Sequence, residues 1–217
     1  MLSKDLFLDF FVALFALLNP FFIVPVFLTL TATYSEIARQ RVAAVAATTV
    51  LCALVVAVMI GDQLLDFLGI QVGSFQIAGG LIVLMLAFGM LKGESAEQKD
   101  AEDAIEEQAN APARGKDIAV YPLAIPLLAG PAVFVTTIVF SVRVNGIGDL
   151  LSMGGSILAI ALVVWLTLAL GTRIARLLSK TAVNIATRIL GILLAAIAVE
   201  MMIAGIDRHF GLLIRGG

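Results

Sequence analysis

Asn19-Pro20-Phe21-Phe22-Ile23-Val24-Pro25 places two prolines inside the first long apolar run of this chain. A second proline cluster, Pro122-Leu123-Ala124-Ile125-Pro126 followed by Ala129-Gly130-Pro131, stands about half a chain length further on. Proline has no backbone N–H, so each cluster leaves a helical carbonyl without its usual donor. Because hydrocarbon offers no water to that carbonyl, a break in a membrane span must face protein, water or a ligand. Paired breaks in the two halves of a chain are typical of transporter binding sites.

The composition indicates an integral membrane protein. Of the 217 residues, 61% are hydrophobic and 14% are charged, and the mean hydropathy is +1.07. A soluble domain of this size cannot bury so much apolar surface. The formal charge of −2 offers no basic surface, so no nucleic-acid partner is expected. Asp5 and Asp9 follow Lys4 closely, unlike a signal peptide, so the first apolar run is predicted to be a retained span.

Six apolar segments reach the length of about 20 residues that a bilayer requires. The predicted spans are 6–30, 42–61, 73–91, 119–141, 152–172 and 187–206. The third and sixth share a pattern, Gln76-Ile77-Ala78-Gly79-Gly80-Leu81 and Arg188-Ile189-Leu190-Gly191-Ile192-Leu193, at nearly the interval that separates Pro20 from Pro131. We therefore predict an all-α membrane protein whose six transmembrane helices form two inverted three-helix repeats, with the first and fourth helices broken at proline.

The connectors define the predicted domains and the orientation. Residues 1–91 form the first repeat, 92–118 an acidic linker and 119–217 the second, inverted repeat. Most lysines and arginines fall in the first, third and fifth connectors, which the positive-inside rule places in the cytoplasm. The prediction is a multi-pass protein of a prokaryotic inner membrane, with a cytoplasmic linker and both termini outside, in the periplasm.

Four motifs in order resemble the MarC family, also called the six-span neutral amino acid transporter family. They are Leu18-Asn19-Pro20, Ile77-Ala78-Gly79-Gly80-Leu81-Ile82-Val83, the two proline motifs of the fourth span and Arg188-Ile189-Leu190-Gly191. The similarity runs from about Leu6 to Ile206. It implies a six-span inner-membrane protein of a family in which some members are linked to uptake of small neutral amino acids.

The two breaks are the predicted substrate site. Asn19 offers an amide beside the backbone groups that Pro20 frees, and the following half-helix points its positive end at an anionic group such as a carboxylate. Gly130 and Pro131 repeat this arrangement, because glycine permits a positive φ and close backbone approach. Thr136 lies one to two turns further on and can contact ligand. The alternative is a pair of plain proline kinks, with Asn19 as a contact between helices.

Residues on the third and sixth spans complete the candidate site. Gln76 and Arg188 occupy equivalent repeat positions, where Arg188 either binds a carboxylate or anchors the helix at the membrane surface. Glu200 is the acid deep in an apolar run, and either takes part in coupling to H⁺ or Na⁺ or reaches the interface. Helix packing is assigned to Gly79, Gly80 and Gly191.

These features favour a secondary transporter of small neutral amino acids or similar zwitterionic solutes, working by alternating access. A non-transporting membrane partner or regulatory protein, and a passive channel, remain as alternatives. Enzymatic activity is not expected, because His209 is the sole histidine and no pair of aspartates lies within a span. No cofactor or metal is predicted. The lipid bilayer is the expected environment, and self-association is left open.

Overall fold

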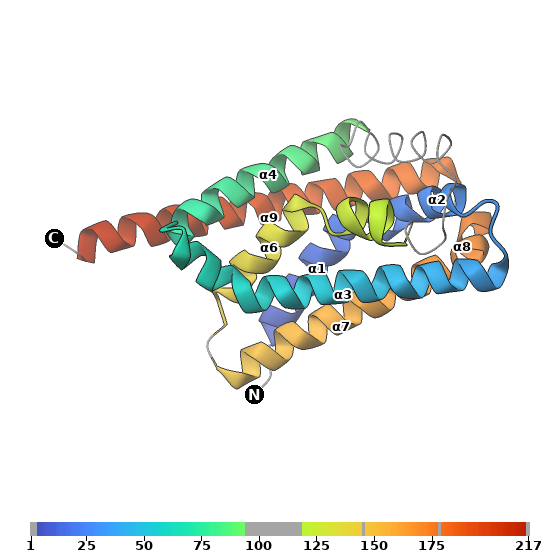
Figure 1. Cartoon of the computed structure of the whole chain (residues 1–217). Coiled ribbons are helices and arrows are strands. Elements are labelled where there is room, and N and C mark those ends of the chain that lie inside the picture. Colours follow the sequence, from blue (N-terminus) through green and yellow to red (C-terminus); the bar gives the residue numbers. More distant parts are fainter. Residues whose placement is uncertain (1–3, 94–118, 145, 178, 216–217) are drawn as a thin grey trace.

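The computed structural model describes residues 4–93, 119–144, 146–177 and 179–215, and these residues form helices and short connections without strands (Figure 1). The acidic segment 94–118 lies outside the described residues. The elements in chain order are α1 (Lys4–Leu18), α2 (Pro20–Leu30), α3 (Glu36–Phe67), α4 (Val72–Lys92), η1 (Ala119–Leu128), α6 (Pro131–Ser141), α7 (Ile147–Ala169), α8 (Gly171–Leu177) and α9 (Lys180–Arg215).

Four of these helices, α3, α4, α7 and α9, are each long and apolar enough to cross a membrane. A fifth candidate span is the pair α1 and α2, which is bent by 40° at Asn19. The described part of the chain adds α6, an apolar helix too short to span alone, which follows η1 after a two-residue gap. The chain is thus an all-helical, multi-pass membrane protein.

The prolines mark helix starts as well as breaks. Pro20 and Pro131 occupy the first turns of α2 and α6, where a missing N–H costs nothing because that group has no partner within the helix. The preceding half-helix η1 contains Pro122 and Pro126 and has widened, π-type turns. Its last turn closes through the N–H of Ala129, which donates to a carbonyl five residues back at 2.8 Å.

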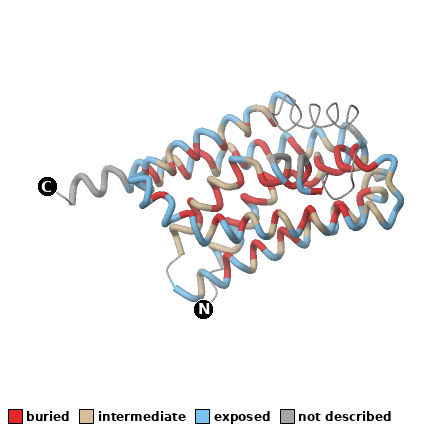
Figure 2. The backbone as a smooth tube through the Cα atoms, in the orientation of Figure 1, coloured by how far each residue is buried: buried red, intermediate tan, exposed pale blue. Residues whose placement is uncertain are grey.

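The helices form three layers (Figure 1). The broken helices α1, α2, η1 and α6 lie between the pair α3 and α7 on one side and the pair α4 and α9 on the other. The C-terminus of α2, the start of α3 and α8 meet at one end of the bundle, at the right of Figure 1, which we call the α2–α8 end. Buried positions concentrate in the middle layer, whereas the long helices carry many exposed positions (Figure 2). Many of these exposed positions are large hydrophobic residues.

Glycines allow α4 and α9 to pack closely along their length. The two helices run antiparallel, with Gly205 against the Gly73 carbonyl and Gly191 against the Ala87 carbonyl. A Cβ at Gly80 would lie 2.7 Å from the Ala198 carbonyl oxygen of α9. Gly79 faces the other way, and a Cβ there would collide with the side chain of Val135 on α6. Small residues at these positions let the two backbones approach closely. This matters because the hydrophobic effect does not drive helices together in lipid, so association depends on van der Waals packing.

We expect Gly80→Ala to lower the free energy of unfolding by about 1–3 kcal/mol, because the added methyl group meets a backbone oxygen that cannot move independently. Thermal unfolding of the purified protein in detergent measures this change. The matched control is Gly154→Ala on α7, where a Cβ meets no atom within 4 Å. That substitution should be neutral or stabilising by up to about 1 kcal/mol through helix propensity. Equal losses for both variants would contradict the packing account.

Candidate functional site

The break between α1 and α2 is centred on a backbone in the left-handed region. Asn19 has φ 39° and ψ 68°, and it is the sole non-glycine residue with positive φ in the described part of the chain. Asparagine tolerates this conformation better than most residues. The Asn19 carbonyl accepts hydrogen bonds from the N–H groups of Phe22 at 3.0 Å and Ile23 at 3.2 Å. The Ala16 carbonyl loses its usual donor, because Pro20 has no N–H.

The Asn19 side chain is fully buried and only half satisfied. Its Nδ2 donates to Thr187 Oγ1 of α9 over 3.3 Å, which connects the break to α9. Its Oδ1 has no hydrogen-bond partner among the described residues. A buried acceptor without a partner typically costs about 1–3 kcal/mol, so this atom is suited to a ligand that brings a donor or a positive charge.

Thr187 was missed in the sequence, where the neighbouring Arg188 was selected instead. The structure leaves Arg188 exposed, whereas Thr187 is buried and faces the break. The position of Thr187 in the sixth apolar segment was visible in the sequence. Which face of that helix meets the first break depends on long-range packing and has no local signal.

The second break has a different geometry. Gly130 has φ −78° and ψ 175°, an extended conformation that any residue can adopt. The sequence suggested a positive φ at this glycine, but the break residue with a positive φ is Asn19. The Gly130 carbonyl accepts from the N–H groups of Val133 at 3.0 Å and Phe134 at 3.2 Å. No side chain caps the N-terminus of α6, since its N-cap residue is a glycine. Pro131 is exposed, whereas Pro20 is buried.

Thr136 and Thr137 on α6 are both fully buried but differ in their hydrogen bonding. The Thr137 hydroxyl donates to the Val133 carbonyl one turn back over 2.7 Å. The Thr136 hydroxyl has no hydrogen-bond partner in the described chain. Thr136 therefore resembles Asn19 in carrying an unsatisfied polar atom in the protein interior.

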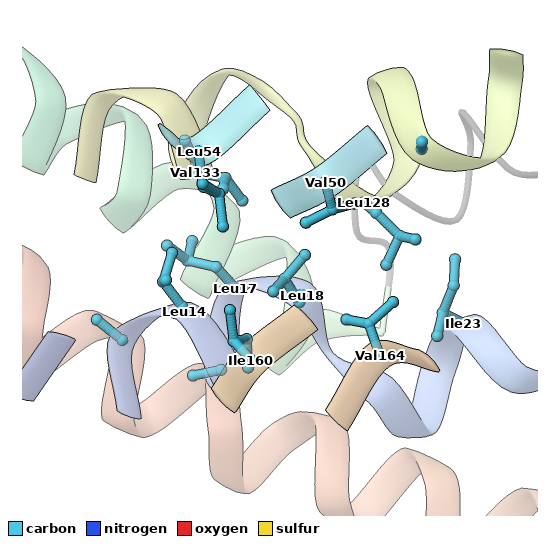
Figure 3. Close-up of a cluster of buried hydrophobic side chains, with 14 of the residues drawn as sticks. Leu14, Leu17, Leu18, Ile23, Val50, Leu54, Leu128, Val133, Ile160 and Val164 are labelled. Carbon is cyan, nitrogen blue, oxygen red and sulfur yellow. The ribbon is translucent and has the colours of Figure 1, made fainter. Parts of the chain in front are cut away.

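Apolar side chains fill the space between the breaks (Figure 3). Leu18 of α1 and Leu128 of η1 lie there, with Val50 of α3 and Val164 of α7 on either side. All four belong to the buried core of the protein. A ligand between the breaks would lie in an apolar chamber with few polar contacts, as is usual for small-molecule sites. In the structure, the core side chains occupy this space.

Gln76 lies in a different part of the bundle. It is 2% exposed, and its Oε1 has no partner among the described residues. Its Cβ would be 3.0 Å from a Cβ at Gly205 of α9, whereas Asn19 contacts Thr187 of the same helix. These two α9 positions are about 18 residues apart, which corresponds to roughly 27 Å along a helix. Asn19 and Gln76 therefore do not meet in one site of the size of an amino acid.

Glu200 is exposed on α9 and lies within electrostatic range of Arg143, which follows α6. The Arg143 guanidinium is half-buried and stacks on the Phe140 ring, 4.9 Å from its centroid. Burial lowers the pKa of Arg143, the carboxylate of Asp9 opposes that change, Arg208 adds to it and Glu200 again opposes it. The charge of Glu200 thus acts at the end of the bundle where α6 ends, away from the Asn19 break.

No group of three or more potential metal-ligating side chains occurs in the described ranges. A cavity of about 600 Å³ opens at the start of α3, lined by Tyr34, Ser35, Arg41 and aliphatic residues. It lies at the far end of α2 from Asn19. The polar atoms that lack partners inside the protein are therefore the main functional candidates.

Known proteins match this chain over nearly its whole length. The family model "MarC family integral membrane protein" matches residues 4–210. The UPF0056 membrane protein YhcE of Escherichia coli is 36% identical over 93% of this chain and 92% of its own length. YvbG of Bacillus subtilis, also named a UPF0056 membrane protein, is 30% identical over 94% of this chain and 95% of its own. No solved structure matches. The chain belongs to the MarC family of integral membrane proteins.

Proposed function

We propose that this protein is a secondary transporter of small neutral amino acids or similar zwitterionic solutes, and that the breaks at Asn19 and Gly130 bind the substrate. The observation that carries the proposal is the Asn19 break itself. A fully buried asparagine is held in a left-handed backbone, with one side-chain oxygen unpaired, inside a helix pair that can span a membrane. Strained, incompletely satisfied residues of this kind concentrate at functional sites.

The polarity of the two breaks fits a zwitterion. Asn19 presents an acceptor, Oδ1, because its amide nitrogen is engaged by Thr187. The N-terminus of α6 after Gly130 presents the Ala132 N–H and the positive end of a helix dipole, without a side-chain cap. An ammonium group suits the first break and a carboxylate suits the second. Neither break residue carries a charge, which favours a solute with no net charge.

The arrangement of helices also supports a transporter. The broken pair α1 and α2 corresponds to η1 and α6, and the long helices pair as α3 with α7 and α4 with α9. Under this proposal the chain has six spans in two inverted repeats, lies in a prokaryotic inner membrane and keeps both termini in the periplasm. Rocking one repeat against the other would open the packed chamber alternately to the two sides.

A permanently open channel is less favoured, because apolar side chains fill the space between the breaks. A regulatory membrane protein would dock through the acidic linker 92–118, of which residues 94–118 lie outside the described part of the chain. The names of the relatives give no substrate, so the substrate class rests on the geometry of the breaks and on the resemblance of the motifs.

We expect a small zwitterion such as alanine, glycine or serine to raise the thermal midpoint of the purified protein. A ligand at 100 times its Kd stabilises the folded state by about 2.7 kcal/mol. Asn19→Ala should abolish the shift by removing the acceptor, and Gly130→Leu should abolish it by placing a bulky side chain beside the N-terminus of α6. Thr137→Val is the matched control, because that hydroxyl is already satisfied within its own helix. No shift across the panel in well-folded protein would reject the substrate class, and an unchanged shift in Asn19→Ala would reject the site.

We expect Thr187→Val to cost about 1–3 kcal/mol of unfolding free energy, since it leaves the Asn19 amide nitrogen buried without an acceptor. Thr187→Ser keeps the hydroxyl and should retain most of that stability. Chemical or thermal denaturation in detergent measures both variants. Adding Thr187→Val to an Asn19→Ala background should cost much less than it does alone. A full additional loss there would show that the hydrogen bond between the two side chains contributes nothing.

A further inference from the structure

Arg39 connects three helices at the α2–α8 end of the bundle. Its Nε donates to Thr31 Oγ1 over 3.2 Å and its Nη2 donates to the Thr31 carbonyl oxygen over 3.1 Å. Its Nη1 donates to Thr172 Oγ1 of α8 over 3.2 Å. Arg39 itself is in the first turn of α3, and Thr31 is the C-cap residue of α2. One guanidinium therefore links the end of α2, the start of α3 and α8.

Thr31, which accepts two of the three hydrogen bonds from Arg39, lies in the protein interior. Thr31 is fully buried, and its hydroxyl donates to the Phe27 carbonyl over 2.7 Å while it accepts from Arg39. The Arg39 side chain is 17% exposed. Its nearest carboxylate, on Glu36, is 3.7 Å away, and the Glu36 side chain is 61% exposed, so solvent screens that ion pair. The contacts that hold Arg39 are thus mainly hydrogen bonds to neutral oxygens, which can be exchanged for water.

Thr31 and Thr172 belong to different halves of the chain. Thr31 lies in the segment before the acidic region and Thr172 in the segment after it. The start of α8 also packs on α2, where a Cβ at Gly171 would lie 3.6 Å from Phe27. Relative movement of the two halves at this end would therefore have to break the hydrogen bond between Arg39 and Thr172.

We propose that Arg39 is the latch that holds the α2–α8 end of the transport pathway closed in this conformation. The inference rests on the proposed alternating-access function and extends it to the residue that controls opening at one end. Helix α2 transmits the effect, because it is flanked by Asn19 at its N-terminus and by Thr31 at its C-terminus. A displacement of α2 that releases Thr31 from Arg39 would also disturb the bond between Asn19 and Thr187.

Arginine suits this role better than lysine. Its planar guanidinium satisfies three separate acceptor contacts in a fixed geometry, whereas a lysine ammonium is a single point donor on a flexible chain. Arg39→Lys should therefore weaken the latch without removing the charge. Arg39→Gln removes the charge and most of the donors.

The test measures the water accessibility of single introduced cysteines, in a background in which Cys52 is replaced by serine. Ile23→Cys reports on the inside of α2, one turn beyond the Asn19 break, where Ile23 is 3% exposed. Val139→Cys reports on α6, towards the other end of the bundle, where Val139 is fully buried. The probe is a small, charged thiol reagent that does not enter lipid, added to the protein in vesicles without substrate.

We expect Arg39→Gln to raise the modification rate of the Ile23→Cys thiol by about tenfold or more, and Thr172→Val to raise it by less. Arg39→Lys should fall between Arg39→Gln and the parent, and Thr172→Ser should restore the parent rate. The modification rate of the Val139→Cys thiol should stay unchanged or fall, because alternating access opens one end at a time. Arg41→Gln is the matched control, since Arg41 lies half a turn away on the same helix and is exposed.

An unchanged rate at the Ile23→Cys thiol in both Arg39→Gln and Thr172→Val would overturn the latch. An equal rise at both introduced thiols, or an equal rise with Arg41→Gln, would show general loosening and would overturn it as well. Thr172→Val removes one acceptor only, so it serves if Arg39→Gln does not fold. A rise confined to the α2 thiol in a protein that binds no zwitterion would keep the latch and reject the substrate class. Zwitterion binding together with unchanged thiol modification rates would keep the substrate class and reject the latch.

Discussion

The constraint on which this structure depends is that a broken helix in hydrocarbon must satisfy its own backbone. Pro20 removes a donor in the middle of the first candidate span, and the chain responds by turning at Asn19 rather than by a simple kink. The Asn19 carbonyl then takes two N–H groups from the first turn of α2. The bend also requires neighbours on every side, and the three-layer arrangement supplies them, with α3 and α7 on one face and α4 and α9 on the other.

Glycine makes the outer layer of this arrangement possible. The α4–α9 pair has to approach closely over many turns while the broken helices pack against it, and Gly79, Gly80, Gly191 and Gly205 each leave a space that another helix occupies. Backbone carbonyls of the partner helix lie close to several of these positions. Close backbone packing gives many van der Waals contacts, and these hold α4 and α9 together in lipid, which is as apolar as the helix surfaces.

Much of the architecture could be predicted from the sequence, because it follows from local chemistry. Helix breaks follow from proline, and long apolar runs follow from the thickness of a bilayer, so α3, α4, α7 and α9 were expected close to their observed positions. The contents of the site depend on non-local packing. Asn19 was selected because Pro20 follows it. Its partner Thr187 is on α9, far away in the sequence, and faces Asn19 only because of how α9 is oriented in the fold. Gln76 was selected for its equivalent repeat position, but in the structure it lies beside Gly205, far along α9 from Thr187.

The two breaks differ in how their half-helices are held, and this difference bears on how α2 would move under the proposed alternating access. Both ends of α2 are held by side-chain hydrogen bonds, from Asn19 to Thr187 and from Arg39 to Thr31, and hydroxyls can exchange such bonds with water or ligand. The N-cap of α6 has no side chain, and α6 is held by its buried apolar residues, among them Val139. Helix α2 also buries apolar residues, among them Val24 and Phe27, so the polar contacts at its two ends are what distinguish it from α6. Under the proposed function, a ligand that binds the Asn19 oxygen would act on a half-helix whose two ends are held by exchangeable hydrogen bonds.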